Sequence, residues 1–375
     1  MTDQSLRPAD VRAWSAVPRR KGGPDVEHVY PAPAPAIDTW APALLDALEV
    51  CVGSSVSFAS GPEAEPHVQG PWAFRFELAS ERGSLPPEWD GELTLRLGDG
   101  DAQLRREASA MRFCAAHDIG VPTVLALVDL GDRERAEPDL RATRALVTRV
   151  PDLVSLAEQI GWNPRHGEAL LGGFARVHAA LHDCDPSGLD SSVPVMSLHD
   201  ELARIDQRRF ASELAWLRDN APPPAPNVLC HGNYQPFCLV GPGPARWDQF
   251  GGPGRGLITS NWCGALLAER EFDVSFTLVA FWIAPFFAPN RSERTATKLI
   301  RNTLSNRYRL SYAEAAHMDR GRVRFWQAFH ALRGMARLAD AYDYEGSPFA
   351  APERGPLPDL IAPQLERLFK MQHRR

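Results

Sequence analysis

The sequence predicts an α+β fold, with strands gathered in its first part and helices in its larger second part. Residues 56–58, 72–78 and 92–97 have the composition of strands, and the last two stretches alternate apolar and polar residues as a half-buried sheet does. From Leu153 onward, apolar residues recur with helical spacing, as in residues 167–183. The separation of the two patterns predicts a sheet-containing region followed by a mainly helical one.

The other elements follow from the same patterns. Residues 1–36 are polar and then proline-rich, which is typical of an extended arm. Apolar spacing predicts helices at residues 37–52 and 104–117, and residues 145–150 predict a strand. In the second part we expect helices over residues 167–183, 199–218, 272–287, 292–309, 312–344 and 358–375.

One stretch, residues 228–273, places polar residues and glycines between short apolar runs. A first apolar run is followed by His-Gly-Asn at positions 231–233 and by Pro236. A Gly/Pro turn and another apolar run then lead to Asn261 and Trp262. These breaks predict a strand, a tight loop, two further short strands, a loop and a helix.

This stretch resembles the catalytic segment of the aminoglycoside phosphotransferase and choline kinase family. That family reads His-Gly-Asp, then Pro-x-Asn, then Ile-Asp-Trp and an acidic pair, and the sequence keeps this frame at His231, Pro236 and Asn261. The resemblance covers roughly residues 37–370 and implies a bilobal, protein-kinase-like fold. It implies an arm at 1–36, a small β-rich N-lobe at 37–151, and a larger helical C-lobe with a substrate-side subdomain at 152–375.

The same resemblance assigns roles to single residues. The family's catalytic aspartate falls on Asn233, its metal-binding asparagine on Cys238 and its metal-binding aspartate on Asn261, while His231 anchors the loop and Asp273 supports it. Asparagine cannot act as a base. Magnesium prefers carboxylate oxygens, and thiols suit softer metals. The substitutions therefore argue against Mg²⁺ at this site.

The resemblance also implies a place for ATP or GTP. No lysine occurs between residues 22 and 297, so the strand position of the family's phosphate-binding lysine falls on Arg96, with Glu107 as its expected ion-pair partner. Arginine can hold phosphate through two hydrogen bonds, although an ordinary outward strand residue is the alternative. The resemblance implies that the adenine ring of the nucleotide would lie against the backbone near Thr148 and Val150. Residues 60–70 correspond to the family's phosphate loop, but their two glutamates favour a plain surface hairpin.

Two further groups have both a functional and a structural interpretation. His178 and His182 lie one helical turn apart, as a metal pair does, but packed structural histidines are favoured because no carboxylate motif adjoins them. The acidic residues at positions 319, 340, 343 and 345 would suit either a pocket for a cationic substrate or solvated helix faces.

Composition narrows the class of protein. The net charge of −6 argues against nucleic-acid binding. The six cysteines form no Cys-x-x-Cys pair, and the N-terminus lacks a signal-peptide pattern. Residues 276–287 are too short to span a membrane. We therefore expect a cytoplasmic protein with reduced thiols, and the sequence leaves its oligomeric state open.

Three functions are compatible with these observations. The favoured one is a pseudokinase, a binding or scaffolding protein for a small-molecule ligand or a protein partner, because several substitutions converge on one site. The alternative is an active ATP- or GTP-dependent kinase for a hydroxyl of a small molecule, in which Glu269 or Glu271 helps to replace the lost metal ligands. A thiol mechanism using Cys230 or Cys238 with His231 is the third.

Overall fold

A computed structural model describes residues 37–64, 72–80, 83–98, 101–131, 144–149, 153–162, 166–283, 291–343 and 357–373 of the chain. The expected arm, residues 1–36, lies outside these ranges, and so does Val150. The strands and helices below are those of the described residues.

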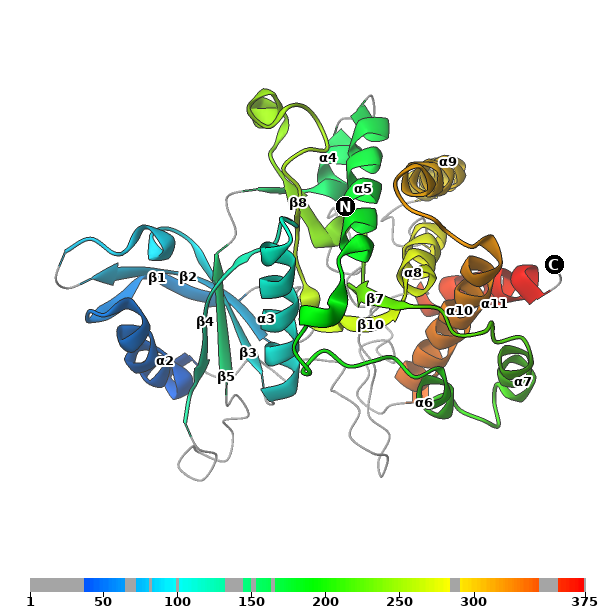
Figure 1. Cartoon of the computed structure of the whole chain (residues 1–375), viewed down its shortest axis with the longest axis horizontal. Coiled ribbons are helices and arrows are strands. Elements are labelled where there is room, and N and C mark those ends of the chain that lie inside the picture. The colour runs from blue at the N-terminus through cyan, green and yellow to red at the C-terminus, as the bar shows by residue number, and fades with distance from the viewer. Residues whose placement is uncertain are drawn as a thin grey trace, which may run out of the picture.

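The first part is a five-stranded antiparallel sheet in the order β1-β2-β3-β5-β4. Its elements are α2 (Ile37–Val52), β1 (Val56–Ala64), β2 (Trp72–Ser80), β3 (Leu93–Gly98), α3 (Asp101–Ala116), β4 (Thr123–Asp129) and β5 (Arg144–Arg149). Figure 1 shows α2 and α3 on opposite sides of this sheet.

The alternation of side chains along β3 explains this arrangement. Leu93, Leu95 and Leu97 pack with the apolar face of α2 in one core cluster, which includes Trp40. Arg96 lies between two of these leucines in sequence and therefore points to the other face of the sheet, where α3 packs. Arg96 is thus a buried cation on the face of the sheet that is turned toward the rest of the molecule.

The second part is mainly helical and carries two small sheets. Its helices are α4 (Leu156–Trp162), α5 (Gly167–Asp183), α6 (Leu198–Ala203), α7 (Ala211–Asp219), α8 (Arg270–Ile283), α9 (Arg291–Ala315), α10 (Arg320–Asp343) and α11 (Leu357–His373). Its strands are β6 (Val154–Ser155), β7 (Asn227–Cys230), β8 (Leu239–Gly241), β9 (Ile258–Thr259) and β10 (Leu266–Glu269). β7 pairs with β10, and β8 pairs with β6 and β9.

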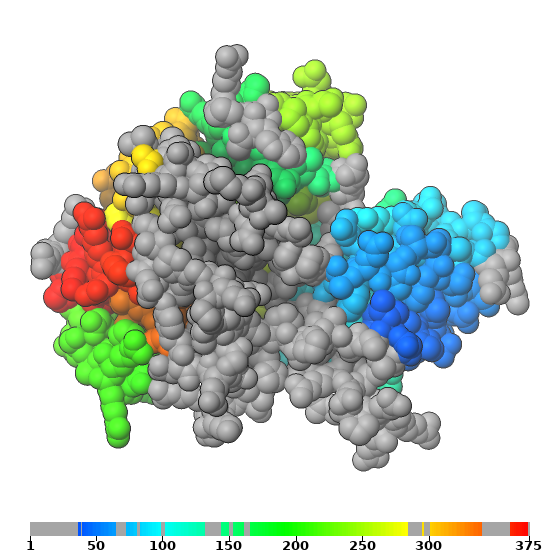
Figure 2. All heavy atoms as spheres, turned by 180° about the vertical axis from the view of Figure 1, so that it is seen from behind, coloured from blue at the N-terminus to red at the C-terminus, as the bar shows by residue number. Residues whose placement is uncertain are grey.

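Helix pairs build the core of this second part. α5 packs on α9, and α10 packs on both α8 and α11. In Figure 2 the N-terminal strands and α2, in blue, lie at one end of the molecule, and α11, in red, lies at the other. The predicted α+β fold, a sheet followed by a helical region, is confirmed. The exact boundaries at 37–151 and 152–375 stay a prediction.

The structure corrects two helices and one loop. The helix predicted over residues 199–218 is two helices, α6 and α7, because the carboxylate of Asp206 accepts the N–H groups of Arg208 and Arg209 in a turn between them. The helix predicted over 312–344 is interrupted because Asp319 accepts the N–H groups at the start of α10. Residues 60–64 of the predicted loop belong to β1, and the remainder of that loop lies outside the described residues.

Asp319 is therefore a helix cap and not part of a pocket for a cation. The side chains at positions 340, 343 and 345, which were grouped with it, lie outside the description. Among the described residues, no helix is both long enough and apolar enough to cross a bilayer.

Candidate active site

The loop after β7 is held by a single carboxylate. The N–H of His231 donates to Oδ2 of Asp273 at 2.6 Å, and the N–H of Gly232 donates to Oδ1 at 3.0 Å. Gly232 has φ +74°, and a Cβ there would lie 2.0 Å from the carbonyl oxygen of Gly264. Only glycine can adopt this positive φ and also avoid the clash with Gly264. Gly232 therefore permits the tight turn whose two N–H groups bind Asp273.

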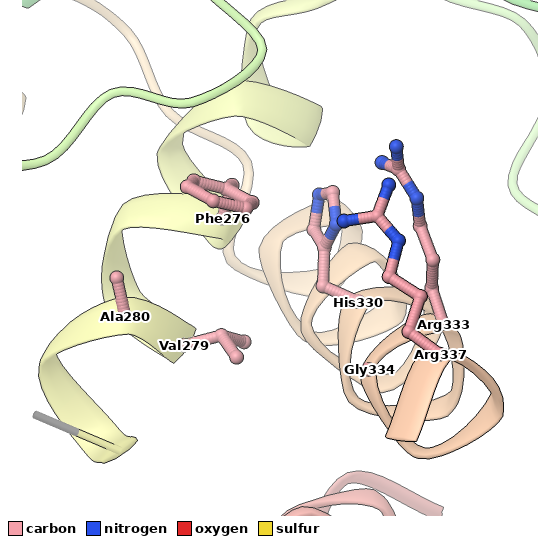
Figure 3. Close-up of a pocket in the computed structure, with 7 residues that line it drawn as sticks. All are labelled: Phe276, Val279, Ala280, His330, Arg333, Gly334 and Arg337. Carbon is pink, nitrogen blue, oxygen red and sulfur yellow. The ribbon is translucent and has the colours of Figure 1, made fainter. Parts of the chain in front are cut away.

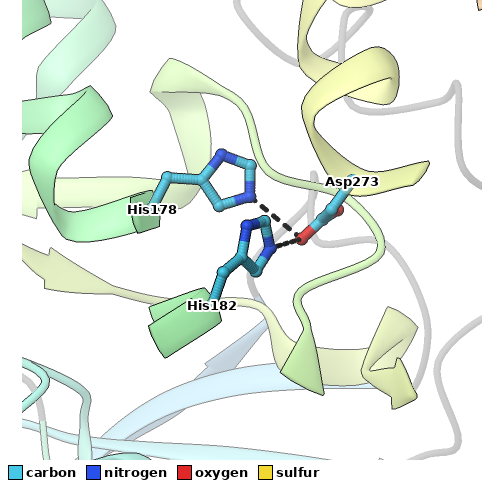
Figure 4. Close-up of side chains that lie close together, drawn as sticks. All are labelled: His178, His182 and Asp273. Atoms are coloured by element: carbon cyan, nitrogen blue, oxygen red, sulfur yellow. Dashed lines mark hydrogen bonds and ion pairs between the residues drawn. The ribbon is translucent and has the colours of Figure 1, made fainter. Parts of the chain in front are cut away.

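Asp273 is in turn held by two histidines of α5 (Figure 4). Nε2 of His178 lies 3.1 Å from Oδ2 of Asp273, and Nε2 of His182 lies 3.5 Å from the same oxygen. The Nδ1 atoms of the two rings each lie 2.7 Å from a tyrosine hydroxyl of α9, Tyr308 for the first and Tyr312 for the second. Because a carboxylate only accepts, each Nε2 carries the proton, and each tyrosine donates to Nδ1.

Burial sets the charge states of this network. Burial alone would raise the pKa of Asp273, but the hydrogen bonds from His178 and His182 outweigh it and hold the pKa well below its usual value. Burial, together with the neighbouring His182, lowers the pKa of His178 to about 3. Asp273 is therefore an anion beside a neutral imidazole at neutral pH.

These three side chains also have the composition of a metal site. One ligand atom from each of His178, His182 and Asp273 lies within 4.8 Å of the others. The carboxylate comes from α8, so the sequence around the histidine pair did not reveal it. The hydrogen bonds to Tyr308 and Tyr312 occupy the Nδ1 atoms, while both Nε2 atoms face the carboxylate of Asp273. The structural interpretation of the pair stays a prediction.

His231 joins the two ends of the stretch at residues 228–273. Its Nε2–H donates to the carbonyl oxygen of Ser260 at 2.9 Å, and its Nδ1 accepts the N–H of Asn233 at 3.3 Å. Burial lowers the pKa of His231, so the ring is neutral and acts as a clamp. Asn233 itself is buried, and its amide oxygen accepts from Nε2 of Gln235 at 3.1 Å.

Asn261 lies at the centre of a small polar cluster. Its backbone is left-handed, with φ 65° and ψ 59°. Its amide oxygen accepts from the thiol of Cys263 at 3.1 Å and lies 3.5 Å from Nη1 of Arg96. Its Nδ2 faces the sulfur of Cys238 at 3.9 Å. The two positions expected to bind metal, Cys238 and Asn261, are thus brought together, and Cys263 is a neighbour that sequence reasoning missed.

Arg96 connects this cluster to the sheet and to α3. Its Nη1 lies 2.7 Å from Oε1 of Glu107, and both side chains are buried. This is the ion pair expected from the sequence. Burial raises the pKa of Glu107, while Arg96 and the backbone N–H of Trp262 act in the opposite direction. The Arg96–Glu107 pair therefore contacts the turn at Asn261–Trp262. Arg96 lies beside the amide oxygen of Asn261, and Glu107 accepts from the backbone N–H of Trp262.

Two residues, Thr148 and Val150, were predicted to lie beside the nucleotide. Thr148 is buried in β5, where it pairs with Thr94 of β3 and Val124 of β4. Val150 lies outside the described residues. Thr148 is thus in the strand next to Arg96, and its expected contact with a nucleotide stays a prediction.

The acidic residues after Asn261 are committed elsewhere. Oε2 of Glu269 accepts from Arg322 at 2.9 Å and from the indole N–H of Trp326 at 3.1 Å. Oε1 of Glu271 accepts the N–H of Asp319 at 3.0 Å. Both carboxylates therefore hold the start of α10 and not the Asn261 cluster, against the expectation that one of them replaces a metal ligand.

Cys230 does not support a thiol mechanism. Its thiol is buried and lies 3.7 Å from each of the carbonyl oxygens of Ala268 and Glu269. Burial, with Asp273 nearby, raises the pKa of Cys230 well above its usual value. A thiol that stays protonated is a poor nucleophile.

Comparisons with known proteins bear on one segment of the chain and on its fold. Residues 87–237 match the model of the phosphotransferase enzyme family, and no curated protein matches the sequence significantly. Among solved structures, the chain is similar to a candidate aminoglycoside phosphotransferase from Ralstonia eutropha JMP134, with 16% identity, a TM-score of 0.56, and 89% of this chain and 98% of that chain covered. It is also similar to a choline/ethanolamine kinase family protein from Mesorhizobium loti, with 15% identity, a TM-score of 0.52, and 90% and 98% covered.

A third similar structure is an amicoumacin kinase in complex with AMP-PNP, Ca²⁺ and Ami, with 14% identity, a TM-score of 0.51, and 84% of this chain and 88% of that chain covered. At such identities these structures show a shared fold. The segment of residues 87–237 is similar to the phosphotransferase enzyme family. The resemblance identified from the sequence is thereby confirmed.

Proposed function

We propose that this protein is a pseudokinase, which keeps the fold to bind a small molecule or a protein partner and does not carry out magnesium-dependent phosphoryl transfer. The observation that carries the proposal is the state of Asn261. Its amide oxygen is already shared between Arg96 and Cys263, and its amide nitrogen faces Cys238. The position offers neither negative charge nor a second oxygen.

Charge is what the metal requires. Magnesium is bound through carboxylate and phosphate oxygens, and it neutralises charge that develops during phosphoryl transfer. Four described carboxylates have structural commitments: Glu107 to Arg96, Glu269 and Glu271 to α10, and Asp273 to the loop. None of these four replaces the missing metal ligand.

The base position supports the same conclusion. In kinases of this fold an aspartate accepts the proton of the attacking hydroxyl. The neutral amide of Asn233 cannot take that proton, and its oxygen accepts from Gln235. Loss of the base alone is compatible with slow transfer, because positioning supplies much of the rate. Loss of the base together with the metal carboxylate is not.

The alternative is an active ATP- or GTP-dependent kinase that phosphorylates a hydroxyl of a small molecule. One observation favours it: the buried Arg96–Glu107 pair is intact and holds a cation beside the Asn261 turn. Such a cation could bind a nucleotide phosphate without a metal. Under either function we propose a cytoplasmic location, in keeping with six free cysteines.

The first experiment is a thermal-shift titration of the wild-type protein with ATP and GTP, each with and without Mg²⁺. A ligand at about 100 times its Kd stabilises the folded state by roughly 2.7 kcal/mol, which is readily measured. We expect no shift that depends on Mg²⁺. A metal-dependent shift with either nucleotide would reject the pseudokinase proposal and favour the kinase.

A variant tests the assignment of the site in the opposite direction. Asn233→Asp, Cys238→Asn and Asn261→Asp together restore the family's residues, and we expect this triple variant to gain Mg²⁺-dependent stabilisation by ATP. The exposed Asn220→Asp is the matched control, because it adds one carboxylate away from the site. If a folded triple variant gains no more than the control, the residue assignments are wrong.

A further inference from the structure

His178, His182 and Asp273 form a cluster of three side chains that can bind a metal (Figure 4). All three side chains are fully buried. The histidines come from α5 and the carboxylate comes from α8, so the cluster joins two helices that are far apart in the sequence. The sequence favoured a structural histidine pair because no carboxylate motif adjoins it, and the fold supplies that carboxylate.

Oδ2 of Asp273 has more donors around it than it can accept. A carboxylate oxygen has about two lone-pair sites. The N–H of His231 takes one of them at 2.6 Å, and Nε2 of His178 takes the other at 3.1 Å. Nε2 of His182 lies 3.5 Å from the same oxygen, and among the described residues it finds no hydrogen bond of normal geometry. A buried polar atom in this state is rare and points to a bound water or ion.

The spacing of the three ligand atoms agrees with a zinc ion. Zinc binds imidazole nitrogen at about 2.0–2.1 Å and carboxylate oxygen at about 2.0–2.2 Å with tetrahedral geometry, which places its ligand atoms roughly 3.3–3.5 Å apart. The two distances from Nε2 to Oδ2 are 3.1 and 3.5 Å, and all three atoms lie within 4.8 Å of one another. Two imidazoles favour zinc over Mg²⁺ and Ca²⁺, which prefer oxygen ligands. The ion would replace the hydrogens on the two Nε2 atoms, so it needs no cavity of its own.

Tyr308 and Tyr312 are placed to support metal-bound rings. Each hydroxyl oxygen lies 2.7 Å from an Nδ1 atom, that of His178 or that of His182. When Nε2 binds zinc, its proton moves to Nδ1, and Nδ1–H then donates to the tyrosine oxygen. Histidines that bind metals almost always donate their other ring N–H in this manner. The rings stay neutral, so the histidines release no proton.

Charge balance adds Cys230 to the cluster. Its thiol is buried and lies against the backbone N–H of Asp273. Zinc bound by one carboxylate and two neutral rings would leave a net positive charge in the core, which is costly. A thiol that binds a metal loses its proton, and the thiolate balances that charge. We therefore expect Cys230 to be the fourth ligand and to release one proton when zinc binds.

We propose that His178, His182 and Asp273 bind a structural zinc ion, with Cys230 as the fourth ligand. Because Asp273 accepts the N–H groups of His231 and Gly232, the ion would hold α5 and α8 to that loop. This inference goes beyond the pseudokinase function, since it needs neither nucleotide nor magnesium.

Metal analysis of the purified full chain, produced with zinc in the growth medium, tests the proposal. We expect about one zinc ion per chain, as a single tetrahedral site requires. Dialysis against EDTA without denaturant should leave the ion bound, because its ligands are buried, whereas EDTA during heating should lower the melting temperature, because the unfolded chain releases the ion. A chain without zinc would overturn the inference. So would zinc that native dialysis removes, because that zinc lies on the surface.

A variant locates the ion. His182→Asn removes the Nε2 ligand, while its amide can still bond the hydroxyl of Tyr312, and we expect the zinc content to fall at least about tenfold. His330→Gln is the matched control because it also removes a buried histidine. Figure 3 shows His330 beside Arg333 and Arg337, whose charges disfavour a metal cation there. Full zinc content in His182→Asn, or equal losses in the two variants, would reject the site.

A second measurement needs no variant and does not depend on the folding of one. X-ray absorption at the zinc edge of the wild-type protein should show imidazole nitrogens at about 2.0–2.1 Å and one sulfur at about 2.3 Å. A spectrum without sulfur would overturn the role of Cys230, and one without imidazole would overturn the site. Either failure would leave the pseudokinase proposal to its own magnesium test.

Discussion

Asp273 is the residue on which the geometry of the catalytic stretch depends. Its two oxygens accept the N–H groups of His231 and Gly232, and two imidazoles face the same carboxylate. A carboxylate can accept from all of these at once, whereas an amide has one oxygen and a donor in place of the other. The ionised form is therefore a structural requirement, independent of any catalysis.

Asp273→Asn tests this requirement. We expect a loss of roughly 3–5 kcal/mol in the free energy of unfolding, because the amide N–H₂ would face a backbone N–H or an imidazole N–H in a buried place. Chemical denaturation monitored by tryptophan fluorescence measures it. Asp185→Asn is the control: Asp185 is an exposed cap that accepts from Ser187, and we expect less than about 0.5 kcal/mol there. Similar losses in the free energy of unfolding for both variants would contradict the structural requirement for an ionised Asp273.

Among contacts of single residues, the sequence predicted those between neighbouring elements and missed those between distant ones. Arg96 and Glu107 could be paired because they fall on the positions of the strand residue and the helix glutamate of the family that the sequence resembles. Tyr308 and Tyr312 could not be found, because they lie on α9, far along the chain from the histidines that they contact. The sequence carries one indication of these contacts: the two histidines are four residues apart, and so are the two tyrosines. Cys263 was missed because its role arises from the left-handed turn at Asn261.

Among the elements, α5 is fitted closely to the loop between β8 and β9. A Cβ on Gly173 would lie 2.1 Å from the carbonyl oxygen of Gly254. Gly254 has φ +75°, and a Cβ there would lie 2.5 Å from the carbonyl oxygen of Ala169. Backbone thus lies against backbone, which is a contact that any side chain would separate.

Gly173→Ala should therefore cost about 3 kcal/mol, since the added methyl must move the loop or the helix. Gly167→Ala, on the same helix, is the matched comparison because a Cβ there meets nothing within 4 Å. That change should be neutral or stabilise by up to about 1 kcal/mol, as alanine favours helix over glycine. Urea denaturation of the two variants decides the matter, and equal effects would contradict the close approach of the loop.

The sequence predicted elements well where one apolar pattern ran uninterrupted, as in α2 and α5, whose bounds agree with the structure. It failed where a polar side chain stops a helix without disturbing the apolar spacing. Asp206 and Asp319 each do this by accepting backbone N–H groups. The apolar residues on both sides of such a cap keep helical spacing. A prediction from that spacing therefore joins the two helices into one.

For the whole molecule, the resemblance in one segment predicted the fold class, because the sheet and the helices must pack around the same catalytic stretch. The packing of α8 against α10 could not be predicted, since the two helices are brought together only by tertiary contacts. The fold was therefore predictable from patterns, whereas the helix faces that meet were not.

Buried histidines give the whole molecule a pH dependence. Burial lowers the folded-state pKa of His178 and of His330 to about 3, and it also lowers that of His231. In the unfolded chain each titrates near its ordinary value of about 6.5. Above that pH neither state binds the protons. As the pH falls below it, the unfolded chain takes up protons that the folded chain refuses, and stability falls.

Each such histidine should contribute a slope of roughly 1.4 kcal/mol per pH unit once the pH is well below 6.5 and above the folded value. Asp273 adds to the loss at lower pH, because its pKa is depressed in the folded state. Glu107 acts in the opposite sense around its ordinary pKa, since burial raises its folded value. The histidines outnumber it, so we expect stability to fall steadily from about pH 6.5 to pH 4.5.

Urea denaturation at pH 7.5, 6.5, 5.5 and 4.5 measures this slope. His330→Gln should reduce it by about one histidine's share, because one of the three imidazoles with a lowered pKa no longer titrates in the unfolded chain. His199→Gln is the control, as His199 is exposed and its loss should leave the slope unchanged. A stability that stays flat between pH 6.5 and pH 4.5 would mean that the folded protein accepts these protons, and that the histidines around the catalytic loop are not held neutral.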